Sequence, residues 1–356
     1  MKTLIAIAAT LAAFVPSPRA QDDRPVAGAE LAIPDPRHEE HAALAAFVGT
    51  WETVGKMEAM PGVPGMEKSI TSTGIERAEL VCNGLWLKST MTGVFGEEVC
   101  EGIWLVGWDP YAKGYVGIWT SSMDEPATFF TGEYDAKART WTFIGETAHG
   151  PMRSTLVHRD ADTSVETCYT KGADGKDLKC AEITRTRKKS PVAIAASAGG
   201  GAAPGAELAR LHAGIGRWDA AVTCEMPGIG RTESKCVEIV SAVCNGRWTW
   251  SDFTGEMGGA PFEGHCLSGY DAAAKQYVSI WIDACAPTFS VCKGTLDEKT
   301  GEFTFRGDCL DPLGKPAHMH QVYTQKDANT RHMKMSFRSE AITNDMEIVY
   351  TRAPRK

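Results

Sequence analysis

The sequence has 356 residues, of which 43% are hydrophobic and 23% are charged. This composition is typical of globular domains and excludes a chain that is disordered throughout, and the length corresponds to about two domains. The formal net charge of −8 gives no reason to expect nucleic acid or an anionic membrane as a partner.

The N-terminus has the pattern of a secretory signal peptide over residues 1–20. Lys2 supplies a basic start, a short apolar run ends at Val15, and Ala20 is a small residue at the expected cleavage position. The apolar run is too short to span a bilayer, and no later segment is apolar enough to do so. We therefore expect export to the periplasm or beyond, with no membrane insertion after cleavage.

An internal repeat is the most informative feature of the chain. The motif Val-Cys-Asn-Gly at residues 81–84 recurs 162 residues later at 243–246, and at the same offset Gly132 matches Gly294. Such self-similarity indicates two copies of one domain. A stretch rich in Ala, Gly and Ser separates the copies and reads as a flexible linker. The predicted parts are a tail at residues 21–37, a first domain at 38–189, the linker at 190–205 and a second domain at 206–353.

Each copy is expected to open with a short helix and to continue almost entirely in strands. In the first copy Leu44, Phe47 and Val48 share one helical face, and β-branched and aromatic segments follow, separated by turn formers about every ten residues. Asp109 and Asp271 stand at such turns and are expected to cap them. About ten short antiparallel strands per copy favour a closed barrel, which leaves no open edge. The predicted fold class is all-β, with two tandem antiparallel barrels.

A family resemblance supports the barrel. A short helix, a Gly-x-Trp motif on the first strand and an Arg on the last strand resemble the lipocalin-type barrel, which implies that the Arg packs over the Trp at one end. The matching pairs are Trp51 with Arg187 and Trp218 with Arg352. A closer similarity is to the bacterial domain of unknown function 1579, seen best in the second copy. It implies a lipocalin- or nitrobindin-like barrel and no particular activity. The residues that carry it are Phe262-Glu263-Gly264, Gly269-Tyr270-Asp271, Lys275, Tyr277, Trp281-Ile282-Asp283 and the segment from Glu347 to Arg352.

Histidines and methionines alternate near the C-terminus in a pattern that first suggests a metal tract. The strand period places Met319 and Tyr323 on one face with Met333, Met335 and Phe337 across a hairpin that turns at residues 326–330. The histidines then fall on the opposite, solvent face. We therefore predict no metal site and interpret the methionines as core. Haem is not expected either, because no His occupies the same repeat position in both copies.

Aromatic residues on the strands either fill the barrels or line a ligand pocket. The alternation Trp248-Thr249-Trp250 places two indoles on one face, which suits a pocket wall. Asp283, next to Trp281, is the best polar candidate inside the second copy. The candidate ligand-binding residues are Trp86, Trp104, Tyr115, Trp119, Trp248, Trp250, Tyr277, Trp281 and Asp283.

Asp283 is also a weak candidate for an acid–base group. The first copy has Ser121 at the matching position, which argues against a catalytic role shared by the two copies. The sequence contains no convincing Ser-His-Asp set, P-loop or dinucleotide-binding loop. We therefore predict no cofactor, and catalysis is the less favoured interpretation.

The eleven cysteines suit an oxidising compartment. Three pairs flank expected hairpin turns, where cross-strand spacing permits a disulfide. The candidate pairs are Cys168 with Cys180, Cys224 with Cys236, and Cys292 with Cys309.

Together these features predict an exported, non-catalytic binder of a small apolar or amphipathic ligand in one or both barrels. Two alternatives stay open: an enzyme that uses a carboxylate in the second barrel, and a structural or protein-interaction module with filled barrels. The oligomeric state is also left open.

Overall fold

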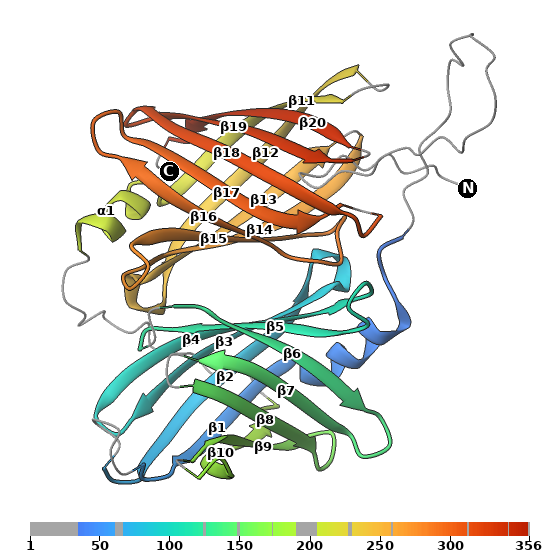
Figure 1. The fold of residues 1–356 in the computed structure, drawn as a ribbon, viewed down its shortest axis with the longest axis vertical. Coiled ribbons are helices and arrows are strands. Elements are labelled where there is room, and N and C mark those ends of the chain that lie inside the picture. The colour runs from blue at the N-terminus through green and yellow to red at the C-terminus, as the bar shows by residue number, and fades with distance from the viewer. Residues whose placement is uncertain are drawn as a thin grey trace. The chain divides into compact units, whose positions relative to one another are not determined.

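A computed structural model gives the fold of the chain and describes residues 35–60, 67–123, 126–147, 150–172, 174–189, 205–226, 230–257, 259–311, 313–340 and 342–354. The chain forms two closed antiparallel β-barrels (Figure 1), which confirms the predicted fold class and the repeat. The predicted signal peptide and most of the predicted tail and linker lie outside the described residues. None of the described helices is long and apolar enough to cross a membrane.

Barrel 1 opens with a short 3-10 helix, η1 (Glu39–Phe47), and a second short 3-10 segment, η2 (Cys82–Gly84), joins two of its strands. Its strands are β1 (Gly49–Met57), β2 (Ile70–Val81), β3 (Trp86–Phe95), β4 (Glu98–Asp109), β5 (Gly114–Ser121), β6 (Thr128–Asp135), β7 (Thr140–Thr147), β8 (Gly150–His158), β9 (Thr163–Lys171) and β10 (Asp177–Arg187).

Barrel 2 opens with helix α1 (Ala206–His212) and contains the matching 3-10 segment η3 (Cys244–Gly246). Its strands are β11 (Gly216–Met226), β12 (Gly230–Val243), β13 (Trp248–Met257), β14 (Ala260–Asp271), β15 (Gln276–Asp283), β16 (Ser290–Asp297), β17 (Glu302–Leu310), β18 (Pro316–Asp327), β19 (Thr330–Ser339) and β20 (Thr343–Arg352).

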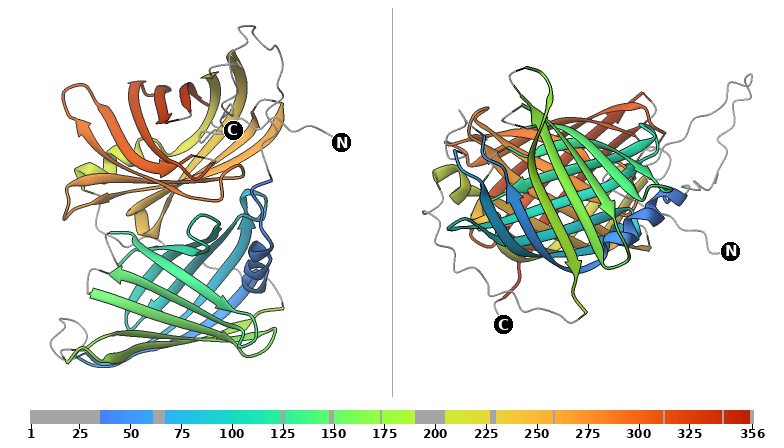
Figure 2. Two further views of the ribbon diagram at one scale, coloured as in Figure 1. Left: turned by 45° about the vertical axis from the view of Figure 1, so that its right-hand side comes forward. Right: turned by 90° about the horizontal axis from the view of Figure 1, so that it is seen from below.

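Both barrels have the same up-and-down topology. Each strand pairs with its neighbours in the chain, and the first strand of each barrel pairs with the last. In the closing registers Trp51 lies opposite Arg187, and Trp218 lies opposite Arg352. The strands are strongly tilted (Figure 2), as closure of a barrel requires.

One end of each barrel is sealed by a tryptophan beneath an arginine. The Arg187 guanidinium lies 3.9 Å from the centre of the Trp51 ring, and that of Arg352 lies 4.0 Å from the Trp218 ring. The Trp51 indole N–H donates to the Phe47 carbonyl at the end of η1, 2.7 Å away. Each arginine also donates to carbonyls that end the opening helix region. The structure thus pairs each tryptophan with the arginine matched to it by sequence.

The glycine of the Gly-x-Trp motif has a steric cause. Gly49 and Gly216 have φ values of +136° and +131°, and a Cβ built on either would collide with Nη1 of the sealing arginine. Glycine is therefore the residue that allows the arginine to approach the backbone this closely.

The repeated Val-Cys-Asn-Gly motif encodes an unusual turn. Cys82, Asn83 and Gly84 have successive positive φ values of 54°, 55° and 86°, and the matching residues of η3 behave in the same way. Left-handed backbone is costly for residues other than glycine, although asparagine tolerates it better than most. The motif thus fixes one left-handed turn between the second and third strands of each barrel.

The opening helix of barrel 1 packs differently from the prediction at one position. Leu44 and Phe47 are buried in the core, as expected. Val48 is exposed, because it ends η1 and its extended backbone (ψ 130°) leads into β1 instead of continuing the helical face. His41 is buried in its place.

Candidate functional site

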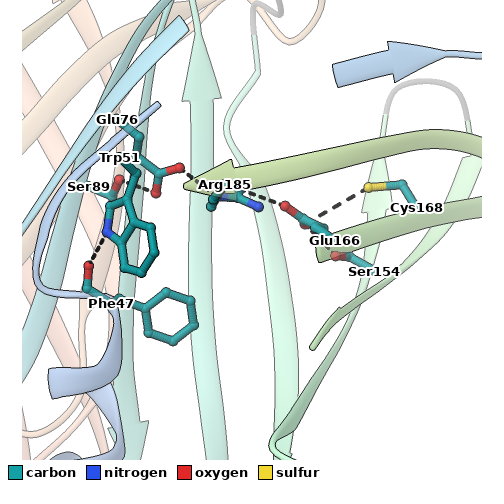
Figure 3. Close-up of polar contacts among 8 residues, drawn as sticks. All are labelled: Phe47, Trp51, Glu76, Ser89, Ser154, Glu166, Cys168 and Arg185. Atoms are coloured by element: carbon teal, nitrogen blue, oxygen red, sulfur yellow. Dashed lines mark hydrogen bonds and ion pairs between the residues drawn. The ribbon is translucent and has the colours of Figure 1, made fainter. Parts of the chain in front are cut away.

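A charged network crosses the interior of barrel 1. The Arg185 guanidinium lies between two carboxylates (Figure 3): its Nε is 2.7 Å from an oxygen of Glu76, and its Nη2 is 2.7 Å from an oxygen of Glu166. The three residues come from β2, β9 and β10. Charged pairs with this hydrogen-bond geometry are much stronger than exposed ion pairs.

Strand alternation directs these side chains inward. Ala78, two residues after Glu76, belongs to the apolar core of barrel 1, and Leu156, which lies directly opposite Glu166, belongs to the same core. Because residues i and i+2, and residues opposite each other on neighbouring strands, share a face of the sheet, both carboxylates point into the barrel.

Small polar side chains complete the network. The Ser89 hydroxyl donates to Glu76 at 2.6 Å, and the Ser154 hydroxyl donates to Glu166. The Cys168 thiol lies 3.9 Å from the same oxygen of Glu166. Each carboxylate is therefore held by the arginine on one oxygen and by a hydroxyl on the other, which fixes the position of both charges (Figure 3).

The pKa shifts of Glu166 and Arg185 favour their charged forms. Burial by itself disfavours the ionised carboxylate of Glu166, but Arg185 and the Ser154 hydroxyl outweigh it and lower the pKa of this carboxyl below its usual value. The two carboxylates raise the pKa of Arg185 against the opposing effect of burial. Burial, together with the charge on Glu166, raises the pKa of the Cys168 thiol well above its ordinary value, so this group stays protonated.

Solvent reaches this network from inside the barrel. The exposed fraction of the side chain is 10% for Glu76, 14% for Arg185 and 19% for Glu166, although all three point inward. The inward-facing side chains of Trp104 and Trp119 are also only partly buried. These inward-facing side chains of barrel 1 are therefore partly accessible to water.

The sealed end of barrel 1 is filled with aromatic rings. Phe47 meets Trp141 edge to face at 5.2 Å between ring centres, and Tyr115 meets the same indole at 4.6 Å. Burial raises the pKa of Tyr115 to about 12, and its hydroxyl donates to the Glu40 carbonyl at 2.8 Å. Trp104 packs edge to face on Phe130 at 5.3 Å and forms the side wall.

Several buried polar atoms inside barrel 1 have no hydrogen-bond partner in the protein. They are Nη1 of Arg185, Nε1 of Trp141 and Nε2 of His158. A buried polar atom without a partner costs about 1–3 kcal/mol. These atoms therefore favour buried water molecules inside the barrel.

Barrel 2 has a reduced version of the network. Glu238 lies 162 residues after Glu76 and pairs with Arg331, and the Ser251 hydroxyl donates to Glu238 at 2.5 Å. Arg331 comes from β19 and lies between the rings of Trp218 and Tyr350, at 4.4 and 4.3 Å. In barrel 2 the Arg331 guanidinium is thus paired with one interior carboxylate, whereas Arg185 in barrel 1 is paired with two.

Sulfur and aromatic side chains make up much of the remaining interior of barrel 2. In barrel 1, Glu166 lies opposite Ile183 on the closing strand. In barrel 2 the matching position opposite Ile348 is occupied by Met333, so a thioether replaces the second carboxylate. Cys292 Sγ lies 3.8 Å from Met319 Sδ, and Gln321 donates to the same thioether at 3.0 Å. This interior is markedly less polar than that of barrel 1.

The structure divides the predicted ligand-binding aromatics between the two faces of the sheets. Five of them belong to or pack against the interior cores: Trp104, Tyr115, Trp119, Tyr277 and Trp281. The inner indoles of Trp119 and Trp281 lie over Gly102 and Gly264, where any larger residue would clash with the ring.

Trp86, Trp248 and Trp250 do not line the barrel interiors, and a role for them in ligand binding stays a prediction. Trp86 alternates with Leu87, which lies in the core of barrel 1, and Trp250 precedes Ser251, which serves the interior carboxylate. All three indoles therefore point to the outside of their barrels. There the Trp250 indole donates to Asp252 at 2.6 Å and stacks on His265.

Asp283 has a structural role in the turn after β15. Its carboxylate accepts hydrogen bonds from the Trp281 indole at 2.7 Å and from the backbone N–H groups of Cys285 and Ala286 at 2.8 and 2.9 Å. These three hydrogen bonds fix the position of the carboxylate within the turn. Asp109 and Asp271 cap their turns in a similar way, as predicted.

The C-terminal hairpin has the predicted register. Met319 lies opposite Phe337, and Tyr323 lies opposite Met333, with these methionines buried in the core. His318 lies on the other face and is exposed.

The six cysteines of the predicted pairs, all within the described part of the chain, are free thiols. The registers explain the error: Cys224 lies opposite Thr232, Cys236 lies opposite Ala220, and Cys168 lies opposite Ala181. Near symmetry about a turn in the sequence therefore did not place two cysteines across from each other. The free thiols are Cys168, Cys180, Cys224, Cys236, Cys292 and Cys309.

The sequence interpretation missed the charged network. Charges within strands read as solvent-facing positions, and Arg185 has no arginine at the matching place in the second copy. One signal was available: Glu76 and Ser89 recur as Glu238 and Ser251 at the offset of the repeat. A carboxylate and a hydroxyl kept together in both copies indicate a shared interior contact.

The comparison with known families gives a clear result. The sequence matches the family described as "Protein of unknown function (DUF1579)" over residues 36–187 and again over residues 203–352. The chain therefore belongs to this family and contains two tandem copies of its domain. No curated protein matches the sequence.

Solved structures show only distant similarity. An S-type phycobiliprotein lyase from Guillardia theta is 13% identical, with a TM-score of 0.32 over 44% of this chain and 97% of the lyase. A DUF3598 family protein from Nostoc punctiforme is 8% identical, with a TM-score of 0.25 over 89% of this chain and 100% of that protein. Similarities this weak carry no argument about function.

Proposed function

We propose that this protein is an exported, non-catalytic carrier or receptor that binds a small amphipathic molecule inside barrel 1. The observation that carries the proposal is the partial solvent exposure of inward-facing side chains: Glu166, Arg185 and Trp104 line the interior, yet none is fully buried. A barrel filled by its own side chains would bury them all.

The interior offers two chemically different surfaces. Trp104, Trp119 and Met152 supply apolar surface on β4, β5 and β8, whereas Glu76, Arg185 and Glu166 supply a polar region on β2, β10 and β9. Ligand pockets commonly combine a mostly apolar lining with a few placed polar groups. An amphipathic molecule matches both surfaces.

Other hollows fit a ligand less well. A shallow depression of about 640 Å³ follows the β6–β7 hairpin, but its lining is the exposed hairpin itself, around Asp135 and Lys137. This site lacks the enclosed apolar wall on which a small ligand depends. The interior of barrel 1 is therefore the better candidate.

A space-filling substitution tests the proposal. Ile183 points into barrel 1 opposite Glu166 and is half-buried, whereas Ile144 points outward from β7 and is 55% exposed. We expect the full chain to bind an apolar fluorescent probe such as N-phenyl-1-naphthylamine, and Ile183→Trp to weaken binding at least about tenfold, since one well-packed indole removes about 1.4 kcal/mol or more of contact.

Ile144→Trp is the matched control and should bind the probe as the parent chain does. Circular dichroism would verify that both variants keep their strands. Equal binding by the parent and Ile183→Trp chains, or no binding by either, would contradict the proposal and favour a scaffold with filled barrels. Native mass spectrometry of the purified chain provides an independent measurement, because a bound molecule adds a discrete mass.

Export has its own test. The N-terminal sequence of the mature protein should begin near Gln21, after the predicted signal peptide. A mature protein that keeps residues 1–20 would contradict export by this route.

A further inference from the structure

We infer that barrel 1 selects ligands that carry a positive charge, with the Glu166 carboxylate as the group that pairs with the ligand cation. The inference deepens the proposed function and rests on it. It begins with a count of the charges that point into the barrel.

Two carboxylates share one guanidinium in the interior. Glu76 and Glu166 are both paired to Arg185, so the network carries one uncompensated negative charge. Arg187 does not compensate it, because its own charge is paired with Asp162 at the sealed end, 3.4 Å away. His158, also inward-facing, has a pKa lowered by burial and by nearby arginines, so it is neutral at pH 7.

Glu166 is the carboxylate that a ligand can reach. Its side chain is 19% exposed, against 10% for Glu76. Its neighbour on β10, Ile183, is also only partly buried, so the accessible surface continues along this wall. Ionised carboxylates offer about four acceptor sites, and the arginine and hydroxyl do not exhaust them.

The second carboxylate is not required to build this fold. Barrel 2 closes in the same way with Glu238 alone on Arg331, and it places Met333 where barrel 1 has Glu166. One carboxylate therefore satisfies the interior guanidinium. Keeping an extra buried charge is costly unless a counter-charge is present, and a cationic ligand supplies one.

Anionic ligands do not fit the same interior. The Nη1 group of Arg185 is buried and inaccessible, and its other donors are held by Glu76 and Glu166. A carboxylate ligand would add a third negative charge to the network. The class of ligand that matches is an amine or other organic cation with an apolar body that contacts Trp104 and Trp119.

A matched series of ligands tests the inference. Decylamine, decanol and decanoate have the same chain and differ in charge at pH 7. Isothermal titration of the full chain below the micellar range should give at least about tenfold tighter binding for decylamine than for decanol, and the weakest binding for decanoate. One partly buried charge pair is sufficient for a preference of this size.

Substitution of Glu166 should then remove the preference for the amine over the alcohol. In Glu166→Gln the amine should lose its advantage, so that the amine and the alcohol bind within about twofold of each other. Glu166→Met, which copies the residue of barrel 2, should behave in the same way. Glu182→Gln is the matched control: it lies on β10 and pairs with Lys179 outside the barrel, so the tenfold preference should persist.

The possible outcomes separate the two proposals. Equal binding of amine and alcohol by the parent chain would overturn the charge selection and leave a neutral binder. No binding of any member of the series would count against both. A preference that survives both Glu166 substitutions would show that the charge acts elsewhere and would overturn the assignment of Glu166. Because the first comparison uses the parent chain, it stands even if a variant fails to fold.

Discussion

The two barrels share their closure and differ in their interiors. Both have a tryptophan under an arginine, a glycine that lets the arginine approach, and a left-handed turn after the second strand. Inside, barrel 1 has two carboxylates on one arginine, whereas barrel 2 has one carboxylate surrounded by thioethers and aromatic rings. The residues that close the barrel are therefore the same in the two copies, whereas the residues that face the interior have diverged.

The interior arginines show how this divergence is constrained. Arg185 on β10 lies opposite Ser164 on β9, and in barrel 2 Tyr350 on β20 lies opposite Arg331 on β19. The arginine has thus changed strands between the copies while its carboxylate partner has stayed in place. The constraint is that the buried glutamate has a guanidinium partner; the strand that provides it is free to vary.

The largest effect is expected when the arginine of barrel 1 is removed. Arg185→Met leaves two buried carboxylates without a counter-charge, which should lower the free energy of unfolding of barrel 1 by about 3–5 kcal/mol. Hydrogen exchange with mass spectrometry would follow peptides of the two barrels separately. Arg153→Met, which removes a partly exposed surface pair with Asp177, should cost about 1 kcal/mol or less. Similar losses for both variants would refute a special role for the interior arginine.

The sealing arginines should have equal effects in the two barrels. Arg187→Met and Arg352→Met each remove a cation–π contact and several hydrogen bonds to carbonyls, so each should cost its own barrel about 2–4 kcal/mol. Lys188→Met, which breaks a surface pair with Glu52, is the control. A loss confined to one barrel would show that the two closures are not equivalent.

Acid should weaken barrel 1 through Glu166. The pKa of this carboxyl is lower in the folded state than in the unfolded chain, so its stabilising contribution is complete above the unfolded value of about 4.3. It is then lost as the pH falls through the folded value. Glu166→Gln should therefore flatten the decline of stability of barrel 1 below about pH 4.3, as measured by urea unfolding followed by hydrogen exchange. An unchanged decline would contradict the charged state assigned to this residue.

The smallest expected effect concerns the chemical reactivity of the buried cysteines of barrel 2. Burial raises the pKa of Cys224 and Cys236 to about 11 and that of Cys292 to about 12. Since the thiolate is the reactive form, iodoacetamide at pH 8 should modify these residues in the folded chain at least about 100-fold more slowly than in urea. A disulfide between Cys224 and Cys236, detected by peptide mapping without reduction, would contradict the observed register.

Much of the fold could be predicted because it depends on local patterns. The period of two, the regular turns and the repeat are sufficient for two barrels, and the pairing of Trp51 with Arg187 follows from family resemblance. The orientation of individual strands was harder to predict. On β13 the rule that apolar residues face inward puts Trp248 and Trp250 inside, whereas Ser251 takes the inner position because it must bond Glu238. Periodicity separates two faces of a strand, but interior hydrogen bonds decide which face is inside.

The order in which the barrels can form follows from their closing registers. In each barrel the first strand pairs with the last, so neither sheet can close until its tenth strand has been synthesised. Such distant pairing slows folding, because the chain entropy must be lost before the contacts form. A nascent chain of this kind therefore stays open for longer than one built from local contacts.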